Sequence, residues 1–263
     1  MVDIRTMLIT AQQDNLNKVV ILNTKGGCGK STLVTNLAAY YAKHVLVPSI
    51  MDHDPQGSSM VWLDRRSPDL PKIHGIAAYK EPMQAPRNWQ PKVPNETEIL
   101  LIDSPAGIDH DDLRKLTRDA TSILIPVLPS SMDIHAAARC VADLLLVAKV
   151  DRRDQKLAIV ANRTRKKTKS FVTLMRFLDS LGIPIIAVLR DTQNFVRSAE
   201  QGIGVCEMQP SRVKPDFAQI EKIASWLDNW PKRRRESRSI MSINKPPSAT
   251  TSSSIRLRLN LGK

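Results

Sequence analysis

The feature that most constrains the fold is a glycine-rich loop placed between an apolar run and a helical repeat. The apolar run covers residues 18–23, and the loop behind it reads Lys25-Gly26-Gly27-Cys28-Gly29-Lys30-Ser31-Thr32. Leu33, Leu37 and Tyr41 then recur at helical spacing. Strand, glycine loop and helix in this order are the context that a phosphate-binding loop requires.

The residue types of this loop suit a phosphate ligand. Glycines let the backbone curl, so that several N–H groups converge on phosphate oxygens at the start of the next helix, where the helix dipole favours negative charge. We expect Lys30 to bridge the β- and γ-phosphates and the Ser31 hydroxyl to ligate Mg²⁺. The full set of expected cofactor-binding residues in the loop is Gly26, Gly27, Cys28, Gly29, Lys30, Ser31 and Thr32.

The rest of the chain alternates apolar runs with helical patterns. Apolar runs cover residues 45–51, 99–103, 122–128, 157–162 and 183–189, and helical patterns cover residues 133–150, 170–181 and 192–201. Near-continuous apolar strands alternating with helices are typical of a parallel sheet covered on both faces. The predicted fold class is therefore α/β, with a single doubly wound, mostly parallel sheet in one domain over residues 18–230.

Two segments break the alternation. Residues 64–97 hold six prolines around one short strand candidate, residues 73–79, and are expected to form a loop-rich insertion that carries specificity. From residue 231 onward the chain is rich in Lys, Arg, Ser, Thr and Pro, which predicts a basic, disordered tail over residues 231–263. A lead segment, residues 1–17, precedes the domain, and from its length we expect no separate N-terminal domain.

Composition narrows the class of protein. Hydrophobic residues make up 42% of the chain, and no uncharged apolar run approaches the roughly 20 residues of a membrane-spanning helix. The N-terminus lacks the zones of a secretory signal, so we expect a cytoplasmic protein. The three cysteines, Cys28, Cys140 and Cys206, are widely spaced without a CxxC pair, which predicts reduced thiols and no zinc framework.

The charge is distributed unevenly. Residues 1–150 hold 16 Lys and Arg against 16 Asp and Glu, whereas residues 151–263 hold 23 against 10. The whole excess of +13 therefore lies in the second part of the chain. A basic half indicates a polyanionic partner, either nucleic acid or an anionic membrane.

The glycine loop departs from the ordinary Walker A pattern at two positions. Thr24 stands where glycine is usual, five residues before Gly29, and Lys25 adds a lysine at the start of the loop. In these features the chain resembles the deviant Walker A group of P-loop NTPases, which includes ParA, MinD, the nitrogenase iron protein and arsenite-pump ATPases. The resemblance implies ATP as cofactor and a homodimer with ATP sandwiched at its interface, where Lys25 reaches the partner's nucleotide.

Two acidic loops follow apolar runs, at the strand ends where switch residues belong. Asp103, in the stretch Ile102-Asp103-Ser104-Pro105, resembles a Walker B aspartate and is expected to hold Mg²⁺ through a water. The stretch Asp52-His53-Asp54-Pro55-Gln56-Gly57 resembles the first switch of ParA proteins. That resemblance implies that Asp54 orients the attacking water and that Asp52 is a supporting carboxylate on the side of the metal ion.

The resemblance also implies ATP hydrolysis and a base contact. Lys25, Lys30 and Asp54 are the expected catalytic residues of a slow ATP hydrolase that a partner stimulates. Asn162, at the end of its strand, is expected to read the adenine edge, with a turn-capping role as the alternative.

The basic half favours the ParA branch, in which phosphate contacts give affinity for any DNA sequence. We expect a nucleoid-associated protein that positions a cargo, together with a small ParB-like or adaptor protein. The alternative is a MinD-like switch ATPase that regulates a membrane or protein assembly. A membrane partner is disfavoured because apolar residues near the C-terminus alternate at period two, unlike an amphipathic helix. The expected DNA-binding residues are Arg163, Arg165, Lys166, Lys167, Lys169, Arg190, Arg197, Lys232, Arg233, Arg234 and Arg235.

Overall fold

Seven parallel strands form one sheet in the computed structural model, which describes residues 16–44, 46–80 and 92–230. The strand order is β3-β2-β4-β1-β5-β6-β7, and each neighbouring pair is parallel. The strands are β1 (Asn17–Ile21), β2 (Pro48–Asp52), β3 (His74–Ala77), β4 (Ile99–Asp103), β5 (Ser122–Val127), β6 (Leu157–Thr164) and β7 (Ile185–Arg190).

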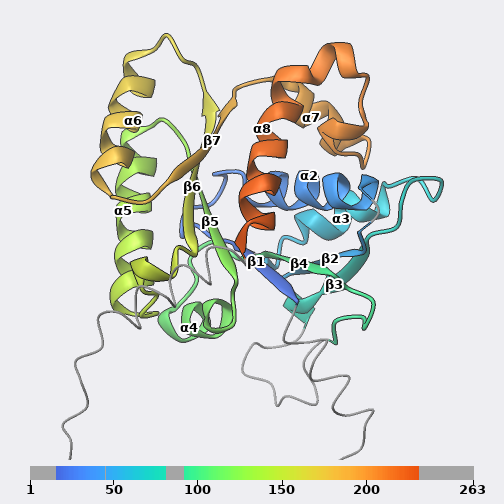
Figure 1. Cartoon of the computed structure of the whole chain (residues 1–263), viewed down its shortest axis with the longest axis horizontal. Helices are drawn as coiled ribbons and strands as arrows, with labels where there is room; N and C mark the ends of the chain where they lie inside the picture. Colours follow the sequence, from blue (N-terminus) through green and yellow to red (C-terminus); the bar gives the residue numbers. More distant parts are fainter. Residues whose placement is uncertain (1–15, 45, 81–91, 231–263) are drawn as a thin grey trace, which may run out of the picture.

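Helices cover both faces of the sheet (Figure 1). They are α2 (Lys30–Lys43), α3 (Ser58–Asp64), α4 (His110–Arg118), α5 (Ser131–Leu146), α6 (Lys169–Ser180), α7 (Gln193–Glu200) and α8 (Pro210–Asp228), with the short 3₁₀ turns η1 (Ala78–Lys80), η3 (Arg152–Asp154) and η4 (Val205–Glu207).

Alternate side chains of the central strand β1 enter two different cores. Val19 and Ile21 pack with α2, α3 and α8, whereas Val20 and Leu22 pack with α4, α5 and α6. This alternation is what a strand buried on both faces requires, because successive side chains point to opposite faces. The predicted doubly wound α/β fold is thereby confirmed.

The structure adds elements that the sequence patterns did not predict. Helices α3, α4 and α8 were not anticipated; α3 spans only seven residues, too short for a periodic signal. The strand candidate at residues 73–79, by contrast, was predicted: β3 forms there as an edge strand beside β2, with His74 aligned to Ser49. The segment 64–97 therefore extends the sheet as well as forming loops.

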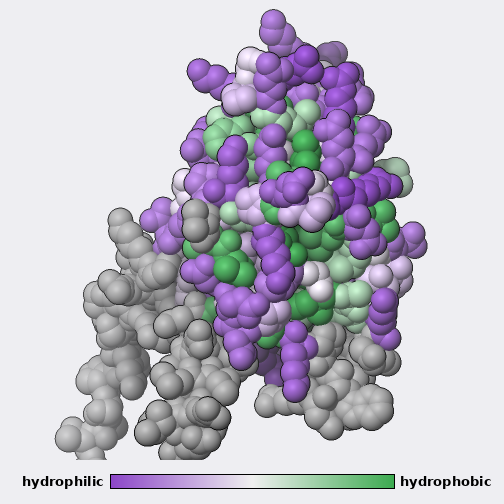
Figure 2. Space-filling model, turned by 90° about the vertical axis from the view of Figure 1, so that its right-hand side faces the viewer, coloured by the Kyte–Doolittle hydropathy of each residue, from purple (hydrophilic) through white to green (hydrophobic). Residues whose placement is uncertain are grey.

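Several predictions fall outside the described residues. The basic tail, with Lys232, Arg233, Arg234 and Arg235, and most of the lead segment belong to those parts of the sequence. Among the helices that the structure does describe, none is long and apolar enough to span a membrane. Figure 2 views the side on which the segment between α3 and β3 projects, and shows hydrophilic residues around a central area of hydrophobic ones.

Candidate nucleotide-binding site

The glycine loop curls around the start of α2, as the sequence predicts. Gly27 and Gly29 have φ angles of 75° and 99°, in the left-handed region that glycine adopts without steric cost. Gly29 is the N-cap of α2, so the unpaired N–H groups and the positive dipole end of this helix face the loop. An anion is the ligand that such an arrangement favours.

Lys30 lies buried beneath the loop. Its Nζ donates to the backbone oxygens of Asn23, at 3.3 Å, and of Lys25, at 3.2 Å. The Asn23 side chain in turn accepts from the Lys25 N–H at 3.0 Å and donates to the Pro126 carbonyl of β5 at 2.8 Å. These bonds fix the loop on two strands and hold the charge of Lys30 against the curled backbone.

A pocket of about 620 Å³ opens in front of the loop. Gly26, Gly27, Gly29, Lys30, Ser31 and Thr32 of the loop line it, together with Asp54 and Arg163 of the predicted site. Its wall also includes Pro55, Gln56, Pro105 and Ala106 of the two acidic loops, and four residues that the sequence patterns did not single out: Thr35, Ser58, Trp62 and Ala199.

Asp103 is fully buried at the end of β4 and lies in register with Asp52 at the end of β2. Its Oδ2 accepts from the Ser59 hydroxyl at 2.5 Å. Burial raises the pKa of Asp103 to about 6, and the neighbouring Asp52 charge adds to the rise, whereas Ser59, Ser31 and Lys30 oppose it. A carboxylate held in so apolar a place is stabilised once a cation approaches.

The donor set here fits a magnesium ion. Asp103 Oδ1 is buried without a hydrogen-bond partner among the described residues, and the Ser31 hydroxyl lies beside this carboxylate. Hard oxygen ligands from one carboxylate and one hydroxyl, completed by phosphate oxygens and waters, are what Mg²⁺ takes in nucleotide sites. The described residues hold no group of three His, Cys, Asp or Glu side chains that could bind a metal ion by itself.

Asp52 shapes the loop that carries Asp54. Its two oxygens accept the N–H groups of Asp54, at 2.9 Å, and of Ser59, at 3.1 Å. Burial raises the Asp52 pKa, and these backbone hydrogen bonds oppose the rise. Asp54 itself is half-buried on the pocket wall and accepts from the Gln56 N–H at 3.0 Å. If Asp52 also bound a metal ion, that contact would compete with the hydrogen bonds from the N–H groups of Asp54 and Ser59 that hold this loop.

Lys25 precedes Gly26 of the pocket wall, and its side chain points to α5. Its Nζ forms an ion pair of 2.8 Å with Asp133, whose side chain is 4% exposed. Asp133 also accepts the hydroxyl of Ser130, the N-cap of α5. A second hollow of about 420 Å³ adjoins this pair and is lined by Thr24, Lys25, Ser131, Met132, His135, Ala136 and Arg139.

Asn162 contacts the phosphate-binding loop directly. Its Nδ2 donates to the Cys28 carbonyl at 2.8 Å, and its Oδ1 accepts from the Arg163 N–H at 2.9 Å. A Cβ on Gly29 would lie 2.1 Å from Asn162 Nδ2, so glycine is required at that position. Both polar atoms of the amide are engaged in this structure, and the adenine contact stays a prediction.

The predicted DNA-binding residues divide into paired and unpaired groups. Arg165 is ion-paired with Asp191 at 2.7 Å, and Arg190 holds the buried Asp216 with bonds of 2.6 Å and 2.9 Å. Asp216 also accepts from Asn194, so Arg190 has a structural task between β7, α7 and α8. Within the described chain, the exposed residues Lys166, Lys167, Lys169 and Arg197 have no ion pair.

Residues 19–205 match the CobQ/CobB/MinD/ParA nucleotide-binding domain family, and this span holds the loop, both acidic strand ends and Asn162. The chain belongs to this family. The ParA/MinD resemblance of the sequence is thereby confirmed, and the pocket in front of Gly29 and Lys30 is the candidate site for the nucleotide.

Known proteins of the ParA/MinD family resemble most of the chain. Maintenance of carboxysome distribution protein A of Halothiobacillus neapolitanus is 27% identical over 195 residues, which cover 72% of this chain and 87% of that protein. Septum site-determining protein MinD of Thermotoga maritima is 23% identical over 239 residues, which cover 78% and 87%. The fold of an McdA–ATP complex from Cyanothece is similar, with a TM-score of 0.58, 15% identity and coverage of 83% and 96%.

Sequence reasoning missed two polar residues that contact predicted side chains of this ParA/MinD-type site. Ser59 contacts Asp103, but a serine in a seven-residue helix gives no pattern of its own. Asp133 follows Ser130 at the spacing of a helix-capping pair, a signal that indicates a helix start and nothing more. Only the fold brings Asp133 to Lys25.

Proposed function

We propose that this chain is an ATP hydrolase that dimerises around ATP, binds duplex DNA without sequence preference and positions a cargo on the nucleoid. The observation that carries the proposal is the placement of Lys25 at the start of the phosphate-binding loop, next to Gly26 of the pocket wall, with a side chain that is 33% exposed. A lysine that served only its own chain's nucleotide would face inward, as Lys30 does. The relatives named for carboxysome distribution support the positioning role.

Hydrolysis in this proposal relies on positioning and charge. The N–H groups of the loop and Lys30 bind the β- and γ-phosphates. Ser31 would ligate Mg²⁺ and Asp103 would hold it through a water, and the ion would supply positive charge at the transferred phosphoryl group. Asp54, half-buried on the pocket wall, orients the attacking water. We expect turnover to be slow without a small ParB-like or adaptor partner, because Asp54 must first be positioned to orient the attacking water.

Dimerisation in this proposal depends on ATP. Each Lys25 leaves Asp133 and contacts the phosphates of the nucleotide bound by the other protomer. ADP lacks the γ-phosphate charge that makes this exchange favourable, so the ADP form is expected to be monomeric.

The DNA contact is proposed for the loop between β6 and α6. Lys166, Lys167 and Lys169 are exposed there, and Arg197 on α7 is exposed as well. Lysines and arginines in exposed loops contact phosphates rather than base edges, which gives affinity for any sequence. Such binding suits a cytoplasmic protein that moves over the nucleoid.

A MinD-like switch that regulates an assembly without touching DNA is the second candidate. The match to septum site-determining protein MinD favours it. A binding assay on a duplex of arbitrary sequence, run with ATP, with ADP and without nucleotide, separates the two. Binding that appears only with ATP supports the proposal, and the absence of DNA binding in all three states supports the switch.

A further inference from the structure

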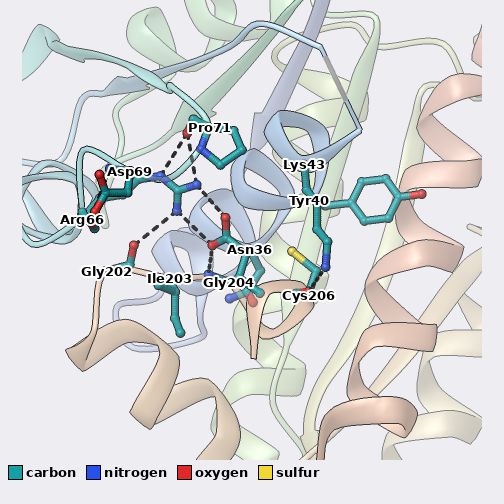
Figure 3. Close-up of polar contacts among 12 residues, drawn as sticks. Asn36, Tyr40, Lys43, Arg66, Asp69, Pro71, Gly202, Ile203, Gly204 and Cys206 are labelled. Carbon is teal, nitrogen blue, oxygen red and sulfur yellow. Dashed lines mark hydrogen bonds and ion pairs between the residues drawn. The ribbon is translucent and has the colours of Figure 1, made fainter. Parts of the chain in front are cut away.

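Beyond the pocket, the chain that leaves α3 is held by a buried ion pair. Arg66 and Glu207 approach to 2.6 Å and 2.9 Å through two pairs of atoms, and their side chains are 5% and 6% exposed. The guanidinium makes its remaining bonds to the carbonyls of Pro71 and Gly202 (Figure 3). Three of its five hydrogen bonds, those to Glu207 and Gly202, thus join the end of α3 to the segment before α8.

Trp62 of α3 repeats this attachment one turn earlier. Its Nε1 donates to the Ile203 carbonyl at 3.3 Å, and the Arg66 guanidinium lies 5.5 Å from the centre of its ring. Gly202 has a φ of 66°, and a Cβ there would lie 2.6 Å from the backbone of Arg65 and Arg66. The segment 202–207 is therefore seated directly on the end of α3.

The same segment also holds the helix that begins at the phosphate-binding loop. The Val205 N–H donates to Asn36 Oδ1 at 2.9 Å, and Asn36 Nδ2 donates to the Thr32 carbonyl at 2.8 Å. Lys43, at the other end of α2, donates to the Cys206 carbonyl at 2.5 Å (Figure 3). η4 is thus a common support for α2 and α3.

The opposite end of α3 reaches the site itself. Ser59 is bonded to Asp52 through its N–H and to Asp103 through its hydroxyl. The loop with Asp54 leads directly into α3, and Ser58 and Trp62 line the nucleotide pocket. A helix of seven residues fixed at both ends leaves the Asp54 loop little freedom relative to the loop at the start of α2.

We propose that Arg66 and Glu207 are positioning residues for ATP hydrolysis: by holding α3 and α2 on η4, they set the place of Asp54 opposite the phosphate-binding loop. This inference rests on the proposed function, in which Asp54 orients the attacking water. A positioning pair differs from a purely stabilising one, because changing it must alter the rate of ATP hydrolysis while the nucleotide affinity stays constant.

Three variants separate positioning from stability. Arg66→Lys keeps the charge but loses the forked contact, since an ammonium group cannot bind both carboxylate oxygens as a guanidinium does. Gly202→Ala leaves both charges in place, but its new Cβ would press on the backbone of Arg65 and Arg66 and so displace the end of α3. Gly182→Ala is the matched control: its φ is 63°, but the nearest atom to a new Cβ is the end of the Arg152 side chain, at 3.1 Å.

The readouts are single-turnover ATP hydrolysis, affinity for fluorescent ADP and ATP, melting temperature, and hydrogen exchange of the amides of residues 54–59. For Arg66→Lys and Gly202→Ala we expect hydrolysis to fall at least fivefold, amide exchange to rise at least fivefold, and both affinities to stay within twofold of wild type. Gly182→Ala is expected to lower the melting temperature and to leave hydrolysis and exchange at 54–59 unchanged.

The inference is overturned if Arg66→Lys or Gly202→Ala folds, melts lower and yet hydrolyses ATP and exchanges residues 54–59 as wild type does. Should one of them not fold, the other decides. A wild-type protein that binds ATP but does not hydrolyse it contradicts the proposed function instead. In that event the exchange rates alone decide whether the ion pair positions the Asp54 loop.

Discussion

Lys25 and Asp133 are joined within one chain by an ion pair of 2.8 Å. The lysine side chain is 33% exposed, whereas the carboxylate is almost completely buried and its Oδ1 has no hydrogen-bond partner among the described residues. If Lys25 moves to a partner's nucleotide, Asp133 is left with an uncompensated buried charge, which is costly. The pair therefore opposes the dimer that Lys25 is proposed to complete.

Asp133→Asn is expected to strengthen ATP-dependent dimerisation, because an amide releases Lys25 without leaving a charge behind. A partly exposed pair of this kind contributes about 1 kcal/mol, and because the dimer breaks one pair in each protomer, its dissociation constant should fall roughly thirtyfold. Sedimentation with ATP measures it, with Asp143→Asn on the same helix as control. Lys25→Ala should lose the ATP-dependent dimer. Unchanged dimerisation in both Asp133→Asn and Lys25→Ala would falsify the trans-acting role of Lys25.

Asp54→Ala is expected to bind ATP and dimerise like wild type while hydrolysis falls at least tenfold. The reason is that Asp54 lines the pocket but takes no part in the hydrogen bonds that hold Lys30 or Asp103. Nucleotide affinity, sedimentation and single-turnover hydrolysis are the measurements. Pro55→Ala, a change in the same loop, serves as control. Wild-type hydrolysis by Asp54→Ala means that another group orients the water.

The sequence predicted the phosphate-binding loop and the sheet well, for physical reasons that are local. A glycine loop between an apolar run and a helix has few other conformations, and strands buried on both faces produce apolar runs that are easy to recognise. Asp54 and Asp103 were singled out because they stand close after or at the end of such runs, near the carboxyl ends of parallel strands, where β2 ends at Asp52 and β4 at Asp103.

The contacts between distant segments could not be predicted in this way. Lys25 meets Asp133, and Arg66 meets Glu207, only after the helices have packed on the sheet. Arg190 shows the converse, since its charge indicated a DNA contact but its guanidinium holds the buried Asp216. Basic residues in a sequence indicate a candidate DNA contact, whereas ion pairs within the fold decide which of those residues are free to make it.

Asp103 is expected to make stability depend on pH. Its pKa is raised to about 6 in the folded protein, so the folded state holds the proton more tightly than the unfolded chain, where the pKa is 3.8. Stability is then highest at low pH, falls as pH rises from about 4 to about 6, and is level above that. Asp52, whose pKa is also raised by burial, faces Asp103 and acts in the same direction, while Lys30 opposes it.

The test compares urea unfolding of wild type and Asp103→Asn without nucleotide at pH 4 and pH 7.5. The variant should be more stable at pH 7.5 by up to about 3 kcal/mol, and the difference should nearly vanish at pH 4. Asp179→Asn, which changes an exposed carboxylate on α6, is the control. A difference that is the same at both pH values contradicts the raised pKa. With Mg²⁺ and ATP, the order should reverse, because Asp103→Asn loses the metal contact.

The last prediction concerns the loop between β6 and α6. Arg165→Glu with Lys167→Glu reverses one paired and one unpaired charge, and should weaken binding to every duplex sequence equally. Each phosphate that is no longer neutralised reduces the slope of log affinity against log salt by about 0.9, so two such phosphates per protomer should reduce the slope of the dimer by roughly 3 to 4. Fluorescence anisotropy with ATP at several salt concentrations measures this slope.

The control for this pair is Lys115→Glu with Arg118→Glu on α4. It makes the same change in net charge, and it again combines an ion-paired residue, Lys115, with a second exposed basic residue. If the control weakens DNA binding as much as Arg165→Glu with Lys167→Glu does, the total charge of the protein is responsible. A local contact would be weakened only by the change in the loop between β6 and α6. Two duplexes of unrelated sequence must respond alike, since contacts to phosphates carry no sequence information. DNA affinity that is indifferent to the loop reversal and to the nucleotide leaves the assembly-regulating switch as the function of this ATPase.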